Sequence, residues 1–105
     1  MSVRIDKDHC IGCGRCIDLC PGNLLKWDAD RGCARMRRPR DCWGCAACVK
    51  ACPSGAILYY LGADIGGTGT TMTMRYEGDY SIWTFVKPDG SREVIAVDRT
   101  ASNQY

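Results

Sequence analysis

The spacing of apolar and polar residues changes along this chain of 105 residues. In the second half, Thr71–Tyr76 alternates strictly between polar and larger side chains, and Tyr80–Lys87 is rich in aromatic and β-branched residues. Pro88–Ser91 is a turn signal that leads into a third alternating segment, Glu93–Asp98. These segments predict a three-stranded antiparallel β-sheet.

The first half predicts shorter elements. Gly14–Cys20 and Ala46–Cys52 each fit a short helix that ends at the proline after it, because proline cannot extend a helix beyond its first turn. Leu24–Asp28 and Ala34–Arg37 flank a turn with aspartate and glycine, which predicts a hairpin. Ile57–Leu61 predicts a strand or extended segment that closes this half.

The first half is an internal repeat built on cysteines. Two runs with the spacing C-x2-C-x2-C-x3-C, each followed by proline, lie 32 residues apart and hold eight of the nine cysteines. The first run supplies Cys10, Cys13, Cys16 and Cys20, and the second supplies Cys42, Cys45, Cys48 and Cys52. This is the spacing of bacterial ferredoxins with two clusters, in which the last cysteine of each run binds the other cluster. Zinc sites rarely use such triple runs.

The spacing therefore predicts two [4Fe–4S] clusters with crossed ligands. We expect the first cluster to be held by Cys10, Cys13, Cys16 and Cys52, and the second by Cys42, Cys45, Cys48 and Cys20. Gly12, Gly14 and Gly44 are expected to let the ligand loops turn tightly and to expose backbone N–H groups toward the sulfur atoms of the clusters. Two adjacent one-electron centres in a chain without room for a substrate pocket indicate an electron carrier. Cys33 is expected to be a packing residue and His9 a surface residue.

Composition agrees with this interpretation. Val, Ile, Leu and Phe number 18 of 105 residues, which is few for an apolar core, so that metal binding is expected to hold the fold together. The formal net charge of +2 would become about −2 with two clusters. A basic run, Arg35–Arg40, predicts either a solvated loop or a docking patch for an acidic partner. Because no membrane helix or signal peptide is visible in the sequence, we expect a cytoplasmic protein.

The predicted fold class is α+β, with a ferredoxin-like segment at residues 1–61. Residues 62–105 are expected to form a glycine-rich joint and the three-stranded sheet. Its glycines do not fit a phosphate-binding loop, because no Gly-Lys-Ser/Thr follows them. Taken from its position alone, Trp43, which lies between two expected ligands, is either a packing lid or a contact across which electrons leave.

Together, several stretches resemble the beta (iron–sulfur) subunit of adenylylsulfate (APS) reductase. They are Cys42–Ile57 with Trp43 between ligands, the glycine-rich joint, the Ile82–Thr84 strand and Asp98–Thr100. The resemblance covers nearly the whole chain, and Trp43 and the added sheet make it more specific than the cysteine runs do.

The resemblance implies that the sheet docks onto a flavoprotein alpha subunit in a heteromer. Electrons would pass through the clusters to FAD in that subunit, which reduces APS, or its 3′-phosphorylated form PAPS, to sulfite and AMP, or PAP. The cluster of Cys42, Cys45, Cys48 and Cys20 would lie nearer the flavin, with Trp43 facing it as the electron-transfer contact. The chain would not be an enzyme on its own, and its electron donor is open.

Two alternative functions would make different demands on the sequence. A freestanding ferredoxin that serves several enzymes would have little need of residues 62–105, whose sheet would leave apolar side chains bare. A regulatory iron–sulfur sensor would need a nucleic-acid-binding element, and the sequence contains none that we recognise.

Overall fold

A computed structural model describes residues 1–101 of the chain. Residues 102–105 of the predicted second segment lie outside the described residues. The helices and strands are β1 (Ser2–Ile5), α1 (Arg15–Leu19), β2 (Leu25–Asp28), β3 (Cys33–Met36), α2 (Ala47–Ala51), β4 (Ile57–Tyr60), β5 (Thr71–Glu77), β6 (Tyr80–Val86) and β7 (Arg92–Asp98). Single 3-10 turns occupy Pro39–Asp41, Ala63–Ile65 and Arg99–Ala101.

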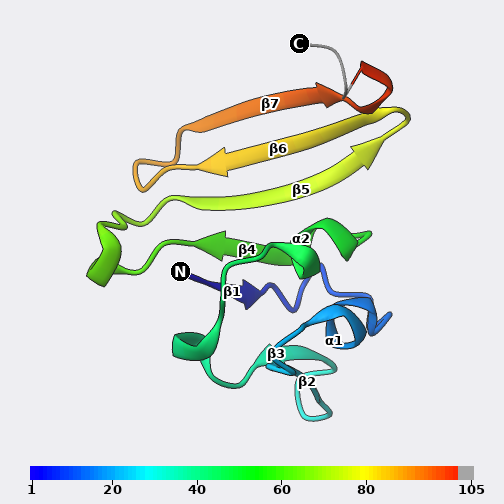
Figure 1. Cartoon of the computed structure of the whole chain (residues 1–105), viewed down its shortest axis with the longest axis vertical. Coiled ribbons are helices and arrows are strands. Elements are labelled where there is room, and N and C mark those ends of the chain that lie inside the picture. Colours follow the sequence, from blue (N-terminus) through cyan, green and yellow to red (C-terminus); the bar gives the residue numbers. More distant parts are fainter. Residues whose placement is uncertain (102–105) are drawn as a thin grey trace.

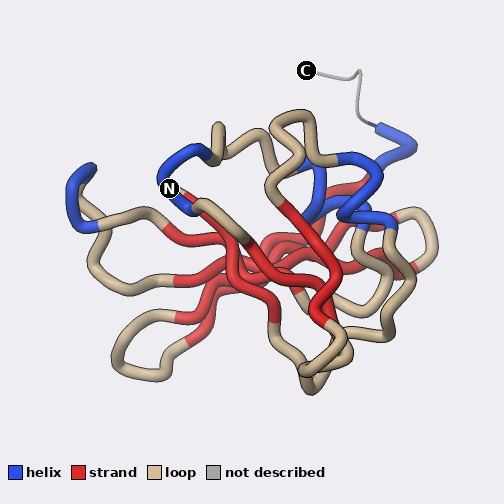
Figure 2. The backbone as a smooth tube through the Cα atoms, turned by 90° about the horizontal axis from the view of Figure 1, so that it is seen from below, coloured by secondary structure: helices blue, strands red, loops and turns tan. Residues whose placement is uncertain are grey.

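Five strands form one antiparallel sheet in the order β1-β4-β5-β6-β7. The hairpin β2-β3 stands apart from it as a second, two-stranded sheet (Figure 1). Figure 2 shows the strands gathered at the centre of the molecule, with the short helices towards its rim. The mixed α+β class and the mainly antiparallel strands agree with the prediction.

The predicted three-stranded sheet needs a correction, because β5, β6 and β7 are the outer part of the five-stranded sheet. Tyr59 and Tyr60 of β4 pair with Met72 and Thr71 of β5, so the sheet continues across the glycine-rich joint. The prediction missed this pairing, and also β1, because the pattern of a short strand does not reveal a partner far along the chain. The division into two domains after residue 61 stays a prediction.

The two cysteine runs occupy equivalent places in the fold. α2 begins 32 residues after α1, at Ala47 and Arg15, and β4 begins 32 residues after β2, at Ile57 and Leu25. Each helix ends at the last cysteine of its run, whose backbone is extended. The repeat in the sequence is therefore also a repeat of helix and strand, as predicted.

The core lies between the cysteine loops and the sheet. Its most deeply buried side chains include Val3 from β1, Leu25 from β2, Val49 from α2 and Ile57 from β4. Met74 of β5 joins them and is only 2% exposed, so the added strands pack directly on the ferredoxin-like part. The hydroxyl of Tyr76 also donates to the carbonyl of Lys50 in α2, at 3.0 Å.

Candidate metal centres

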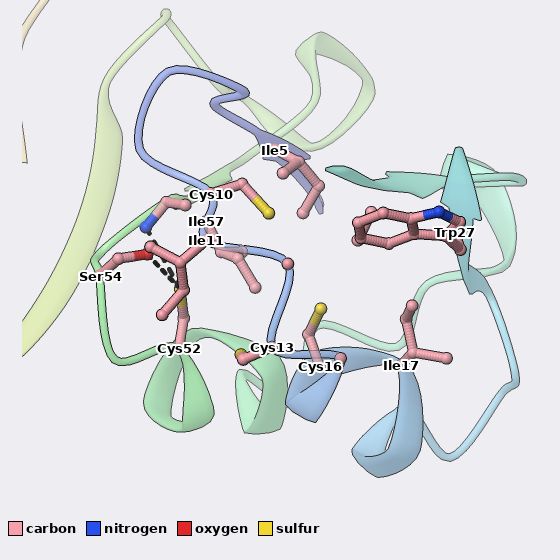
Figure 3. Close-up of a pocket in the computed structure, with 14 residues that line it drawn as sticks. Ile5, Cys10, Ile11, Cys13, Cys16, Ile17, Trp27, Cys52, Ser54 and Ile57 are labelled. Atoms are coloured by element: carbon pink, nitrogen blue, oxygen red, sulfur yellow. Dashed lines mark hydrogen bonds between the residues drawn. The ribbon is translucent and has the colours of Figure 1, made fainter. Parts of the chain in front are cut away.

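The first pocket is lined by the four cysteines that were expected to share a cluster. Cys10, Cys13 and Cys16 come from the loop before α1 and from its first turn, and Cys52 comes from the end of α2. The space between the atoms, including the part open to solvent, is about 370 Å³. In Figure 3 the sulfur atoms of Cys10 and Cys16 point towards the middle of the pocket.

The second pocket, of about 400 Å³ measured in the same way, repeats this arrangement. Cys42, Cys45 and Cys48 come from the loop before α2 and from its first turn, and Cys20 comes from the end of α1. The first three cysteines of the two runs also match in exposure, since Cys13 and Cys45 are exposed and Cys16 and Cys48 are buried, whereas Cys52 is more buried than Cys20. Each pocket thus combines three cysteines of one run with the last cysteine of the other.

The cysteine pockets fit a multi-iron cluster better than a single ion. Within residues 1–101, no three His, Cys, Asp or Glu side chains converge closely enough to hold one metal ion. A structural zinc ion needs four sulfur atoms about 2.3 Å from one point, whereas a [4Fe–4S] cluster takes one thiolate at each of four separate iron atoms. Four thiol groups spread around a pocket with largely apolar walls meet the second requirement.

Backbone N–H groups donate to the sulfur of the last cysteine in each run. The N–H of Leu24 lies 3.4 Å from Cys20 Sγ, and the N–H of Ala56 lies 3.3 Å from Cys52 Sγ. Both hydrogen bonds depend on a left-handed residue just before the donor, Asn23 with φ 55° and Gly55 with φ 66°. Such hydrogen bonds stabilise a sulfur that carries negative charge.

Sequence reasoning missed these two donors, because it looked for them at the glycines inside the ligand loops. The signal that could have found them is the repeat itself. Asn23 stands three positions after Cys20, and Gly55 stands three positions after Cys52. Asparagine and glycine are the two residue types that most readily adopt a left-handed conformation.

The environment changes the pKa of three cysteine thiols. Burial, assisted by the neighbouring Cys52, raises the pKa of Cys16 to about 11, and burial raises the pKa of Cys48 to about 12. Burial also acts to raise the pKa of Cys52, but hydrogen bonds from the Ser54 hydroxyl and from backbone N–H groups outweigh it and lower the pKa. Cys16 and Cys48 are therefore protonated at neutral pH without metal, and binding iron at them must release protons.

Aromatic side chains stand at the rims of both pockets. Trp43 lines the second pocket and is 66% exposed, which agrees with a position at the surface between two expected ligands. Tyr59 of β4 lines the same pocket, and its hydroxyl donates to the carbonyl of Gly44 at 3.2 Å. Trp27 of β2 lines the first pocket. Sequence reasoning singled out neither Trp27 nor Tyr59.

The remaining candidates lie away from the pockets. Cys33 is fully buried in β3 and lines neither pocket. His9 is exposed, and its Nδ1 lies 2.7 Å from a carboxylate oxygen of Asp6. In the basic run, Arg38 forms a surface ion pair with Asp41 at 3.4 Å. No helix in the described part of the chain is long and apolar enough to cross a membrane.

Several known proteins are similar to this chain. A family model, the 4Fe-4S dicluster domain, matches residues 9–56. A ferredoxin of Moorella thermoacetica is 50% identical over 36 residues, which make up 34% of this chain and 54% of that ferredoxin. A ferredoxin of Pyrococcus woesei is 62% identical over 21 residues, which make up 20% of this chain and 100% of that sequence.

One solved structure extends the similarity beyond the cysteine runs. It is adenosine 5′-phosphosulfate reductase in complex with substrate, which matches with a TM-score of 0.72 and 27% identity over 90% of this chain and 66% of the reductase chain. The chain thus spans about two thirds of that reductase chain and about half of the Moorella ferredoxin. It belongs to the ferredoxins with a 4Fe-4S dicluster domain, and the resemblance to the iron–sulfur subunit of APS reductase that the sequence indicates is confirmed.

Proposed function

We propose that this chain transfers electrons through two [4Fe–4S] clusters with crossed ligands. The first cluster would be held by Cys10, Cys13, Cys16 and Cys52, and the second by Cys42, Cys45, Cys48 and Cys20. The observation that supports this most strongly is that each pocket is lined by three cysteines of one run and the last cysteine of the other. When bound, each cluster supplies a site that gains and loses one electron.

The protein's own part is to place the two sites side by side and to stabilise the charged sulfur atoms of their ligands. Cys16 and Cys20 are four residues apart, about one turn of α1, yet they line different pockets. One helical turn therefore separates a ligand of one site from a ligand of the other, and α2 repeats this with Cys48 and Cys52. The N–H groups of Leu24 and Ala56 favour the negatively charged sulfur.

We further propose that the chain is the iron–sulfur subunit of a reductase complex and has no enzyme activity alone. Its partner would be a flavoprotein alpha subunit whose FAD receives the electrons and reduces APS, or PAPS, to sulfite. The likeness to the solved reductase over 90% of the chain supports this. The strand β7 at the edge of the sheet also supports it. Its Val94, Ile95 and Val97 are 60%, 53% and 41% exposed, and exposed apolar side chains on an unpaired strand favour the docking of a partner.

In that complex, Trp43 would be the contact through which electrons leave the second site. Its exposure of 66% beside Cys42 and Cys45 supports this role, because a residue that only fills a core would be covered. The cytoplasm is the compartment we propose, since thiolate ligands of iron are maintained under reducing conditions.

The ligand assignment is tested by Cys20→Ser, with Cys33→Ala as the control. The wild-type protein should contain about eight iron atoms and give two reduced-cluster signals in electron paramagnetic resonance (EPR) spectra. Cys20→Ser should disturb the signal of the site that contains Cys42, Cys45 and Cys48, while Cys33→Ala should keep both signals. Unchanged iron content and unchanged spectra in Cys20→Ser would refute crossed ligation.

The subunit assignment is tested separately by native purification. A complex that contains a larger, FAD-binding chain supports it. A protein that elutes as a monomer of about its own 11.6 kDa, without a flavin-containing partner, would instead favour a freestanding ferredoxin.

A further inference from the structure

Each cysteine pocket has an aromatic side chain from the strand that follows its helix. Trp27 in β2 lines the first pocket, and Tyr59 in β4 lines the second. The two residues are 32 positions apart, which is the period of the cysteine repeat. They therefore occupy the same place in the two halves, although one is an indole and the other a phenol.

Both side chains lie against a glycine of the ligand loop. A Cβ atom added to Gly12 would lie 3.1 Å from Cη2 of Trp27, and one added to Gly44 would lie 2.8 Å from the hydroxyl oxygen of Tyr59. Gly12 and Gly44 are again equivalent in the repeat, and each lies between the first two cysteines of its run. Each aromatic residue thus reaches over to the loop that carries three of the four thiol groups.

The two aromatic side chains differ in how they are held in place. Tyr59 is held through its hydroxyl, whose one proton can be donated to the Gly44 carbonyl at 3.2 Å or to Met1 Sδ at 3.1 Å. The approach of Trp27 to Gly12 is an apolar contact of the ring, and Trp27 is 49% exposed. One part of the indole therefore lies against the pocket while the other faces water. In Figure 3 the indole lies across the pocket from Cys52.

We propose that Trp27 is the cover of the first pocket and controls the access of water to the cluster there. This rests on the proposed ligand set of Cys10, Cys13, Cys16 and Cys52. An apolar cover slows the loss of iron, because water, dioxygen and chelators must pass it. It also lowers the reduction potential of that one site. The reduced cluster carries more negative charge than the oxidised one, so it loses more solvation free energy when water is kept away. Trp27 thus gives the two sites different rates of iron loss and different reduction potentials.

The experiment compares four proteins purified without oxygen: wild type, Trp27→Ala, Trp27→Phe and Ile11→Ala. Ile11 is the matched control, since it is an apolar residue of the same pocket and is 67% exposed, but it belongs to the ligand loop and not to the strand β2 that reaches over this loop. Iron release into excess EDTA is followed by the loss of visible absorbance, and each site is titrated with reductant by EPR. If Trp27→Ala does not fold by circular dichroism, Trp27→Val takes its place, because valine suits a strand but is too short to reach Gly12.

In Trp27→Ala, half of the iron should leave about tenfold faster or more, and the other half at the wild-type rate. One of the two EPR signals should also move to higher potential. Trp27→Phe should restore most of the wild-type behaviour, and Ile11→Ala should resemble wild type.

Three outcomes would overturn the proposal: wild-type iron release in Trp27→Ala, equal acceleration of both halves, or the same effect in Ile11→Ala. A different result would refute the proposed function, namely a wild-type protein that does not contain about eight iron atoms.

Discussion

Replacing Gly44 by alanine is expected to weaken the fold more than replacing Gly14 by alanine. Both glycines have positive φ, 70° at Gly44 and 77° at Gly14. An alanine in this left-handed region costs roughly 1–2 kcal/mol. About 0.4–1 kcal/mol of that is offset because alanine stiffens the unfolded chain. Ala46, the repeat equivalent of Gly14, has φ 63° and shows that alanine is accepted at this place.

The side chains around each glycine make the two variants differ in stability. A Cβ atom at Gly14 meets nothing within 4 Å, whereas at Gly44 it would lie 2.8 Å from the Tyr59 hydroxyl and against the side chain of Met1. The methionine is flexible and can move, but Tyr59 would lose its hydrogen bond to the Gly44 carbonyl, worth about 1 kcal/mol. We therefore expect about 1 kcal/mol of destabilisation for Gly14→Ala and about 2 kcal/mol for Gly44→Ala.

The assay is thermal unfolding of the iron-loaded protein without oxygen, at one fixed heating rate, followed by far-UV circular dichroism. A loss of 1 kcal/mol lowers the Tm of a domain of this size by about 4–8 °C, so Gly44→Ala should melt about 8–16 °C below wild type and Gly14→Ala about half as far below. Equal shifts in the two variants would refute the role given to Tyr59, and no shift in Gly14→Ala would refute the backbone argument.

Two further predictions concern the added strands. Met74→Ala should destabilise the protein by about 2–5 kcal/mol, because Met74 is 2% exposed where β5 meets the cysteine loops; a Tm close to that of wild type would show that the sheet does not depend on this contact. Hydrogen bonds from Thr100 hold the pKa of Asp98 below its ordinary value of 3.8, so this carboxylate stabilises the fold above that pH and the contribution is lost as pH falls through the lowered pKa. Carbon-13 NMR titration of Asp98 should show the low pKa in wild type and a higher one in Thr100→Val, and the same pKa in both would contradict this assignment.

Sequence patterns alone predicted the local elements and the choice of chemistry. Two identical cysteine spacings predicted the ferredoxin family, and the periodicity located both helices, the β2-β3 hairpin and the strands β4 to β7 to within about a residue. These features depend on neighbours a few positions apart, and that is what a sequence pattern records. The sharing of Cys20 and Cys52 between the two sites was also predicted from the sequence, and Cys20→Ser is its test.

The contacts between distant segments are visible in the folded structure and not in the sequence. The pairing of β4 with β5 joins the predicted sheet to β1, and the place of Trp27 and Tyr59 over Gly12 and Gly44 depends on how strands return to the ligand loops. Such contacts are set by packing and strand register across long stretches of chain, and short-range periodicity does not encode them.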